Sequence, residues 1–92
     1  MIDKKEITNR VDILFGLMRH NIKYHNLSNT SDILNLLINI INKIKNNDNG
    51  IYIKNDIKKN FMYQLLETIE MINDNHPLWN NLNKLYNEIE EW

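Results

Sequence analysis

Five large apolar residues recur toward the C-terminus at steps of four, three, four and three: Leu78, Leu82, Leu85, Ile89 and Trp92. This spacing places their side chains along one stripe of an α-helix, which is the pattern of a helix that packs on other helices. A proline suits the first turn of a helix, where no backbone donor is needed. We therefore predict an amphipathic helix over residues 77–91.

Three earlier segments carry the same periodicity and predict helices over residues 4–24, 31–46 and 56–73. Asp3 is the expected cap of the first helix, and Thr30 or Ser31 that of the second. Short links favour antiparallel neighbours, so we expect an all-α fold, a small up-down-up-down four-helix bundle. The alternative is a three-helix core with the last helix packed across it. The residues at the seam centres are expected to be buried: Leu14, Leu37, Ile41, Leu65, Ile69, Leu82 and Leu85.

Two of these helices have apolar surfaces wider than a single seam. Ile13 and Phe15 are expected to widen the seam of the first helix. In the second, apolar residues that include Leu36 cover well over half of the circumference. A helix this apolar is the central one, or it has a second buried contact.

The links between the predicted helices contain turn-forming residues. Residues 25–29 are expected to connect the first two helices, and residues 46–50, Asn-Asn-Asp-Asn-Gly, form a turn signal. Residues 51–53, Ile-Tyr-Ile, are the one β-like run. A strand this short has no partner. We interpret the run either as an extended loop whose isoleucines fill the core or as an early turn of the third helix.

The composition describes an ordinary globular chain. Its 92 residues are 42% hydrophobic and 25% charged, which predicts one domain over residues 1–92. The net charge of −1 argues against a nucleic-acid partner, and the absence of cysteine fits a reducing cytoplasm. We expect no secretory signal, membrane span, metal or cofactor. The chain holds eighteen asparagines, fifteen isoleucines and no alanine, as AT-rich genomes favour, so helicity must come chiefly from tertiary packing.

Arg19 and His25 form the sharpest chemical pair, an arginine followed by a polar residue and then by a histidine six positions on. This spacing resembles the signature of HEPN ribonucleases, which are all-helical and dimeric. The resemblance implies that Arg19 stabilises a phosphate and that His25 acts as acid or base on a 2′-hydroxyl. The alternative is a solvated helix C-terminus, where both residue types are favourable because that end of the helix dipole is negative.

Other polar clusters have weaker chemical meaning. Glu67, Glu70 and Asp74 share a helical face, as do the Mg²⁺-binding acids of helical nucleotide pyrophosphohydrolases, but a second acidic pair is missing. The histidines at 20, 25 and 76 lack the spacing of a metal site. A solvated acidic face is therefore the expected arrangement.

Charge is distributed unevenly along the chain. Residues 43–60 carry five lysines against two aspartates, a balance of +3, and residues 61–92 carry one lysine against six acids, a balance of −5. The lysines are Lys43, Lys45, Lys54, Lys58 and Lys59. A small DNA-binding regulator that reads through Lys58, Lys59 and Asn60 is one interpretation, against which the near-neutral total charge counts.

The end of the last helix is the expected partner-binding surface. Acids in a last helical turn oppose the helix dipole, and tryptophan and tyrosine are residue types that anchor interfaces. These aromatics either complete a small core or contact a partner with a basic surface. The predicted surface comprises Trp79, Tyr86, Glu88, Glu90, Glu91 and Trp92. The next candidate is the stripe of Asn35, Asn39, Asn42 and Asn46.

We expect a small non-enzymatic protein-binding module that acts by covering a surface of another macromolecule, with a homodimer as a further possibility. The overall form resembles bacteriocin immunity proteins and phage-encoded inhibitors of host defence. That resemblance, of architecture and size, implies an inhibitor or immunity-type protein of a phage, plasmid or other mobile element. The alternatives are the HEPN-like ribonuclease and the DNA-binding regulator.

Overall fold

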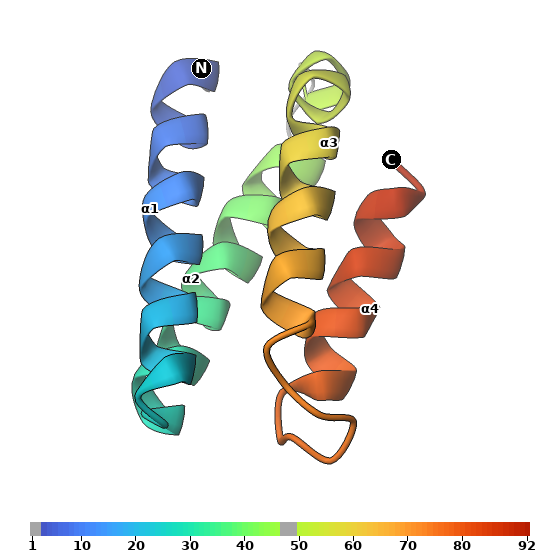
Figure 1. Ribbon diagram of the computed structural model, residues 1–92. Helices are drawn as coiled ribbons and strands as arrows, with labels where there is room; N and C mark the ends of the chain where they lie inside the picture. The colour runs from blue at the N-terminus through green and yellow to red at the C-terminus, as the bar shows by residue number, and fades with distance from the viewer. Residues whose placement is uncertain (1–2, 47–49) are drawn as a thin grey trace.

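The described part of the chain forms four α-helices that run alternately up and down, as the sequence predicts (Figure 1). The computed structural model describes residues 3–46 and 50–92, without the side chains of residues 50–52. The helices are α1 (Lys4–Lys23), α2 (Leu27–Lys45), α3 (Gly50–Ile69) and α4 (Trp79–Glu90). Helix α1 packs on α2 and α3, and α3 also packs on α2 and α4.

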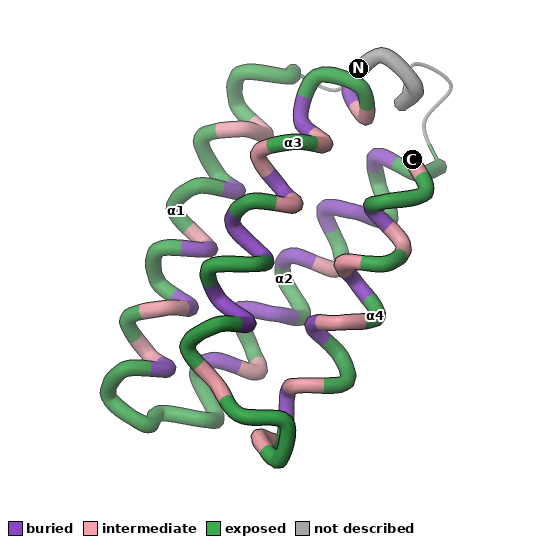
Figure 2. The backbone as a smooth tube through the Cα atoms, turned by 45° about the vertical axis from the view of Figure 1, so that its right-hand side comes forward, coloured by how far each residue is buried: buried purple, intermediate pink, exposed green. Residues whose placement is uncertain are grey.

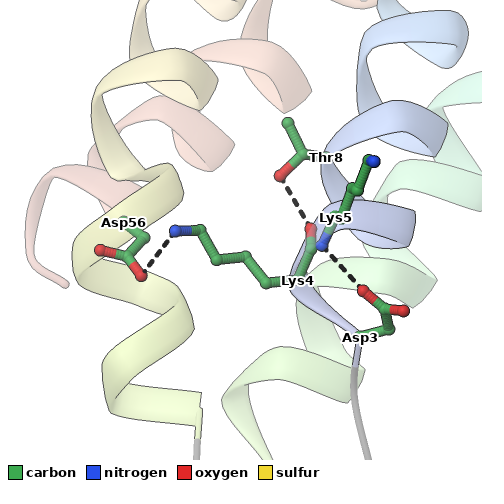
Figure 3. Close-up of polar contacts among 5 residues, drawn as sticks. All are labelled: Asp3, Lys4, Lys5, Thr8 and Asp56. Atoms are coloured by element: carbon green, nitrogen blue, oxygen red, sulfur yellow. Dashed lines mark hydrogen bonds and ion pairs between the residues drawn. The ribbon is translucent and has the colours of Figure 1, made fainter.

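Helix α1 begins where the sequence places it. The Asp3 carboxylate accepts a hydrogen bond from the backbone N–H of Lys5 at 3.0 Å (Figure 3). It accepts a second from the backbone N–H of Glu6 at 3.3 Å. These bonds satisfy two donors that a helix start leaves unpaired. At the same end of the bundle, Lys4 forms an ion pair with Asp56 of α3 at 3.0 Å. This ion pair connects the start of α1 to the first half of α3.

Helix α2 begins four residues earlier than predicted, because Asn26 caps it instead of Thr30 or Ser31. The Asn26 side-chain oxygen accepts a hydrogen bond from the Asn29 backbone N–H at 3.1 Å. The Asn26 main-chain carbonyl accepts one from the Thr30 hydroxyl at 2.7 Å. Thr30 is buried inside the helix. Only residues 24–26 remain between α1 and α2, which holds the two helices as an antiparallel hairpin.

Helix α3 starts at Gly50, six residues before the predicted start, so residues 51–53 form an early helical turn and not an extended loop. Ile53 is buried. Residues 47–49 of the predicted turn lie outside the described residues. The helix ends at Ile69 instead of residue 73, because the N–H groups of Met71 and Ile72 bond three residues back and tighten the last turn.

Helix α4 starts at Trp79, two residues after the predicted position. His76 accepts the hydrogen bonds that precede the first turn of α4. Its side-chain Nδ1 accepts one from the Leu78 N–H at 3.0 Å, and its main-chain carbonyl accepts one from the Trp79 N–H at 3.1 Å. Pro77 therefore lies in the turn before the helix. In Figure 1, α4 runs antiparallel to α3, which excludes a last helix packed across a three-helix core.

The core is the apolar interior of the bundle, and buried positions line the inner side of each helix (Figure 2). Its centre contains an edge-to-face pair of Phe15 and Phe61, with ring centroids 5.8 Å apart. Of the seven residues expected at the seam centres, six are buried. The exception is Leu14, which is only partly buried because it lies at the edge of the contact between α1 and α2. None of the described helices has the length and apolar character that crossing a membrane requires.

Candidate functional site

The aromatic residues of the C-terminal end lie against the core. Trp79, Tyr86 and Trp92 are each partly buried and pack on the buried cluster. The Trp92 ring meets Phe61 edge to face, with centroids 6.0 Å apart. These aromatics therefore contribute to the small core while part of each remains exposed.

Lysines of α2 and α3 lie beside the C-terminal end of α4. Lys45 of α2 pairs with Glu88 at 3.2 Å. Lys58 of α3 donates to the main-chain oxygen of Trp92 at 2.9 Å, and the Lys54 ammonium lies 5.6 Å from the Trp92 ring centroid. Positive charge at a helix C-terminus offsets the repulsion between acids and the helix dipole. The basic and acidic segments of the sequence are therefore neighbours in space, and one of the three acids, Glu88, is paired within the fold.

Arg19 and His25 have separate surroundings. Arg19 is half-buried against α3, and its Nη1 is buried without a hydrogen-bond partner among the described residues. It lies near Tyr63 of α3. There the Glu67 carboxylate, which accepts a hydrogen bond from the Tyr63 hydroxyl, raises the pKa of Tyr63, while the Arg19 charge lowers it. His25 lies in the exposed turn between α1 and α2. No contact joins Arg19 to His25 in the described structure.

His25 has a clear structural role at the end of α1. Its φ of 58° is left-handed, its N–H bonds to the Ile22 carbonyl at 3.1 Å, and the Asn26 N–H bonds to the Asn21 carbonyl at 2.9 Å. This is a Schellman motif, in which one left-handed residue closes the last turn of a helix. The motif accounts for the left-handed backbone of His25, which any residue that tolerates this conformation could supply.

A cleft of about 470 Å³ opens at the loop end of the bundle, where the α1–α2 connection meets the α3–α4 connection. His25 and His76 both line it, together with several asparagines and the buried Thr30. The sequence carries no signal of this cleft because its lining comes from segments about fifty residues apart. Its groups can exchange hydrogen bonds with a small polar molecule, and neither an acid nor a lysine or arginine lines it.

The remaining polar candidates are dispersed. Glu67, Glu70 and Asp74 are exposed, and the described residues include no group of three or more His, Asp or Glu placed to hold a metal. Of the three residues of the DNA-reading hypothesis, Lys58 binds the main chain of Trp92, and Asn60 donates to Asp12 of α1 at 2.9 Å. Only Lys59 points to solvent without such a contact.

An exposed apolar surface lies where α1 and α2 meet. Ile13 is 62% exposed, Leu17 47% and Leu36 50%. Beside them a groove of about 260 Å³ is lined by Arg10, Ile13, Leu14, Leu36, Asn39, Ile40 and Lys43. We call this surface the α1–α2 face, comprising those groove residues and Leu17. The expectation that Ile13 widens the packed seam of α1 is wrong, because Ile13 is exposed. Leu36 is exposed as well, so the described bundle does not cover the whole wide apolar surface of α2.

The asparagine stripe of α2 borders this face. Asn35, Asn39, Asn42 and Asn46 are all exposed, and Asn39 itself lines the groove. The second candidate surface predicted from the sequence is therefore accessible and continuous with the apolar one. Comparisons of the chain with protein-family models, with curated proteins and with solved structures found no match.

Proposed function

We propose that the protein is a non-enzymatic protein-binding module that covers a surface of another protein with its α1–α2 face. The observation that carries this proposal is the exposure of Ile13, Leu17 and Leu36 side by side around a groove. Scattered single apolar residues on a surface are normal, whereas a contiguous group rimmed by polar residues is typical of interaction sites. An inhibitor or immunity-type protein of a mobile element would act in this way.

The chemistry of the face favours a helical partner that carries acidic residues. A groove between two helices suits the apolar stripe of a third helix. Arg10 and Lys43 stand at the rim, and neither forms an ion pair with a described residue. Carboxylates on the partner would form ion pairs with Arg10 and Lys43. The partner expected from the sequence was basic, because that expectation rested on the acids of α4, of which Glu88 pairs with Lys45 in the fold.

Site-specific photocrosslinking in the cells that encode the protein tests this proposal. A benzophenone amino acid placed at Leu17 should crosslink another protein, and the same group placed at Tyr63, which is more accessible and lies on α3, should not. Leu36→Glu, which puts a charge into the apolar face, should abolish the crosslink. Leu66→Glu on α3 is the matched control and should keep it, since Leu66 is exposed to a similar extent.

The ribonuclease and the DNA-binding regulator are the alternatives to this proposal. RNA cleavage by the purified protein, lost in a double variant Arg19→Ala, His25→Ala, would support the first. Binding of duplex DNA that weakens steeply with salt and depends on Lys59 would support the second. Either result, together with the absence of a crosslink at Leu17, would replace the protein-binding proposal.

A further inference from the structure

We propose that the cleft at the loop end of the bundle binds an uncharged heterocyclic base, as part of a free nucleobase or nucleoside. The two connections that form this cleft lie at the same end of the bundle (Figure 1). Its volume of about 470 Å³ lies within the range of about 300–1,000 Å³ that is typical of small-molecule sites. The described residues that line it are all different from those of the α1–α2 face, so the inference does not rest on the proposed function.

Three polar residues of the cleft are held in place by hydrogen bonds to the main chain. The Asn21 amide donates to the Leu17 carbonyl at 2.7 Å, which leaves the Asn21 side-chain oxygen as an acceptor. The Asn26 side-chain oxygen accepts the bond that caps α2, which leaves its NH₂ group as a donor. The His76 Nδ1 accepts the Leu78 N–H, so the neutral ring carries its proton on Nε2. The cleft therefore contains both donors and acceptors whose side chains are ordered before a ligand enters, which lowers the entropic cost of binding.

Two asparagines of the α3–α4 connection add complete amide groups. Asn73 and Asn75 line the cleft and are exposed, and neither side chain hydrogen-bonds to another described residue. An amide presents a donor and an acceptor side by side. The edge of a heterocyclic base offers the complementary pair, which is how asparagine recognises adenine. These two residues are therefore the expected contacts with the edge of the ligand.

The walls of the cleft suit the flat faces of such a ligand. Leu27 and Met71 are 44% and 43% exposed, so the fold leaves much of these two apolar side chains uncovered. The imidazole ring of His25 lies in the same lining. Bases stack on histidine rings and on apolar side chains. The apolar residues of the lining are Ile22, Leu27, Met71, Ile72 and Pro77.

The lining selects for a ligand without charge. It contains neither an acid nor a lysine or arginine among the described residues. A phosphate or carboxylate that entered would lose hydration without gaining an ion pair. A saccharide is uncharged too, but hydroxyl groups surround its ring, whereas the donors and acceptors of a base lie in one plane between two apolar faces. The combination of apolar walls and amides therefore favours the base.

Titration of the ¹⁵N-labelled protein with adenosine, guanosine, cytidine and uridine tests the site. We expect at least one nucleoside to bind with a Kd below about 1 mM. It should shift the amide signals of residues 21–30 and 71–77, which contain the lining, and leave those of the α1–α2 face unchanged. No shift with any nucleoside up to its solubility limit, or equal shifts on the α1–α2 face, would overturn the inference.

Two further titrations test the class of ligand. Methyl glucoside is uncharged but has no heterocycle, so it should not bind. The 5′-monophosphate of the bound nucleoside should bind no more tightly than the nucleoside itself, because no lysine or arginine lines the described cleft. Glucoside binding as strong as that of the nucleoside would overturn the assignment of a heterocycle. Monophosphate binding that is tighter by about tenfold or more would overturn that of an uncharged ligand.

Substitutions test the residues that contact the ligand. Asn73→Asp and Asn75→Asp each replace an amide donor with a charge and should each weaken nucleoside binding by at least about tenfold. Asn35→Asp is the matched control, because Asn35 is equally classed as exposed, lies on α2 outside the cleft and should not affect binding. Circular dichroism verifies that each variant folds. Unchanged affinity in both cleft variants, or an equal loss in Asn35→Asp, would overturn the inference.

Discussion

At the scale of single residues, the contact between α1 and α3 depends on a small polar network. Asp12 of α1 accepts hydrogen bonds from the side-chain amides of Asn60 and Gln64 of α3, at 2.9 and 2.8 Å. Gln64 is buried, and its amide lies within 3.5 Å of the Asn60 side-chain oxygen. Buried amides are costly without partners, so this network selects one register between the two helices.

Removal of the carboxylate should therefore destabilise the fold. We expect Asp12→Ala to lower the free energy of unfolding by about 1–2 kcal/mol, because it leaves the Gln64 amide with one long hydrogen bond. Asp12→Asn keeps an acceptor and should lose less. Urea unfolding of both variants measures the difference. Equal stability of Asp12→Ala and the wild type would show that solvent replaces the carboxylate at no cost.

Two consecutive leucines of α3 provide a contrast in packing. Leu65 is completely buried, whereas Leu66 points to solvent. Leu65→Ala should cost about 2–5 kcal/mol, a large share of the stability of a small domain, since it opens a cavity in the core. Leu66→Ala should change stability by less than about 0.5 kcal/mol. Thermal or urea unfolding of the pair tests the assignment, and similar losses for both would contradict the orientation of α3.

At the scale of elements, the start of α2 shows how a side chain sets a helix boundary. Asn26 rather than Ser31 supplies the cap, so Asn26→Ala should lower the free energy of unfolding by about 1 kcal/mol. Ser31→Ala should have little effect, because Ser31 lies inside the helix, beyond its first turn. Unfolding of the two variants is the measurement. A larger loss for Ser31→Ala would support the boundary expected from the sequence.

At the scale of the whole molecule, charges far apart in the sequence are combined at one end of the bundle. The lysines of α2 and α3 surround the acidic end of α4, through Lys45 with Glu88 and Lys58 with Trp92. These groups are largely exposed, so each pair contributes at most about 1 kcal/mol. Their importance is that they place positive charge beside the acidic C-terminal end of α4.

The relative placement of Arg19 and His25 also belongs to this scale. Arg19 faces α3 and His25 closes α1, so the pair is not assembled into a common site. We expect the double variant Arg19→Ala, His25→Ala to keep the crosslink at Leu17 and the biological activity of the wild type. His25→Gly alone should fold at least as stably as the wild type, since glycine adopts a left-handed conformation without strain. Loss of activity in the folded double variant would show that this end of α1 is functional.

The sequence by itself determined the helices and most of the core. Apolar residues at steps of three and four have only one regular structure that buries them together, so the spacing alone identifies Leu65, Ile69, Leu82 and Leu85 as core residues. Helix boundaries were less certain because capping is a choice among neighbouring polar residues. Asn26, Thr30 and Ser31 are all suitable caps, and tertiary packing, which buries Thr30, decided among them.

Only the tertiary structure decided what lies on the surface. Periodicity shows that a side chain is apolar and on which side of a helix it lies, but not whether a neighbour covers that side. Phe15 and Ile13 are two residues apart, and one is buried at the centre while the other is exposed, because no helix of the described bundle covers the outer side of α1. The contacts of Lys45 with Glu88 and of Lys58 with the main chain of Trp92 were likewise not predictable from the sequence. Both depend on contacts between segments whose separation along the chain carries no signal of their proximity in space.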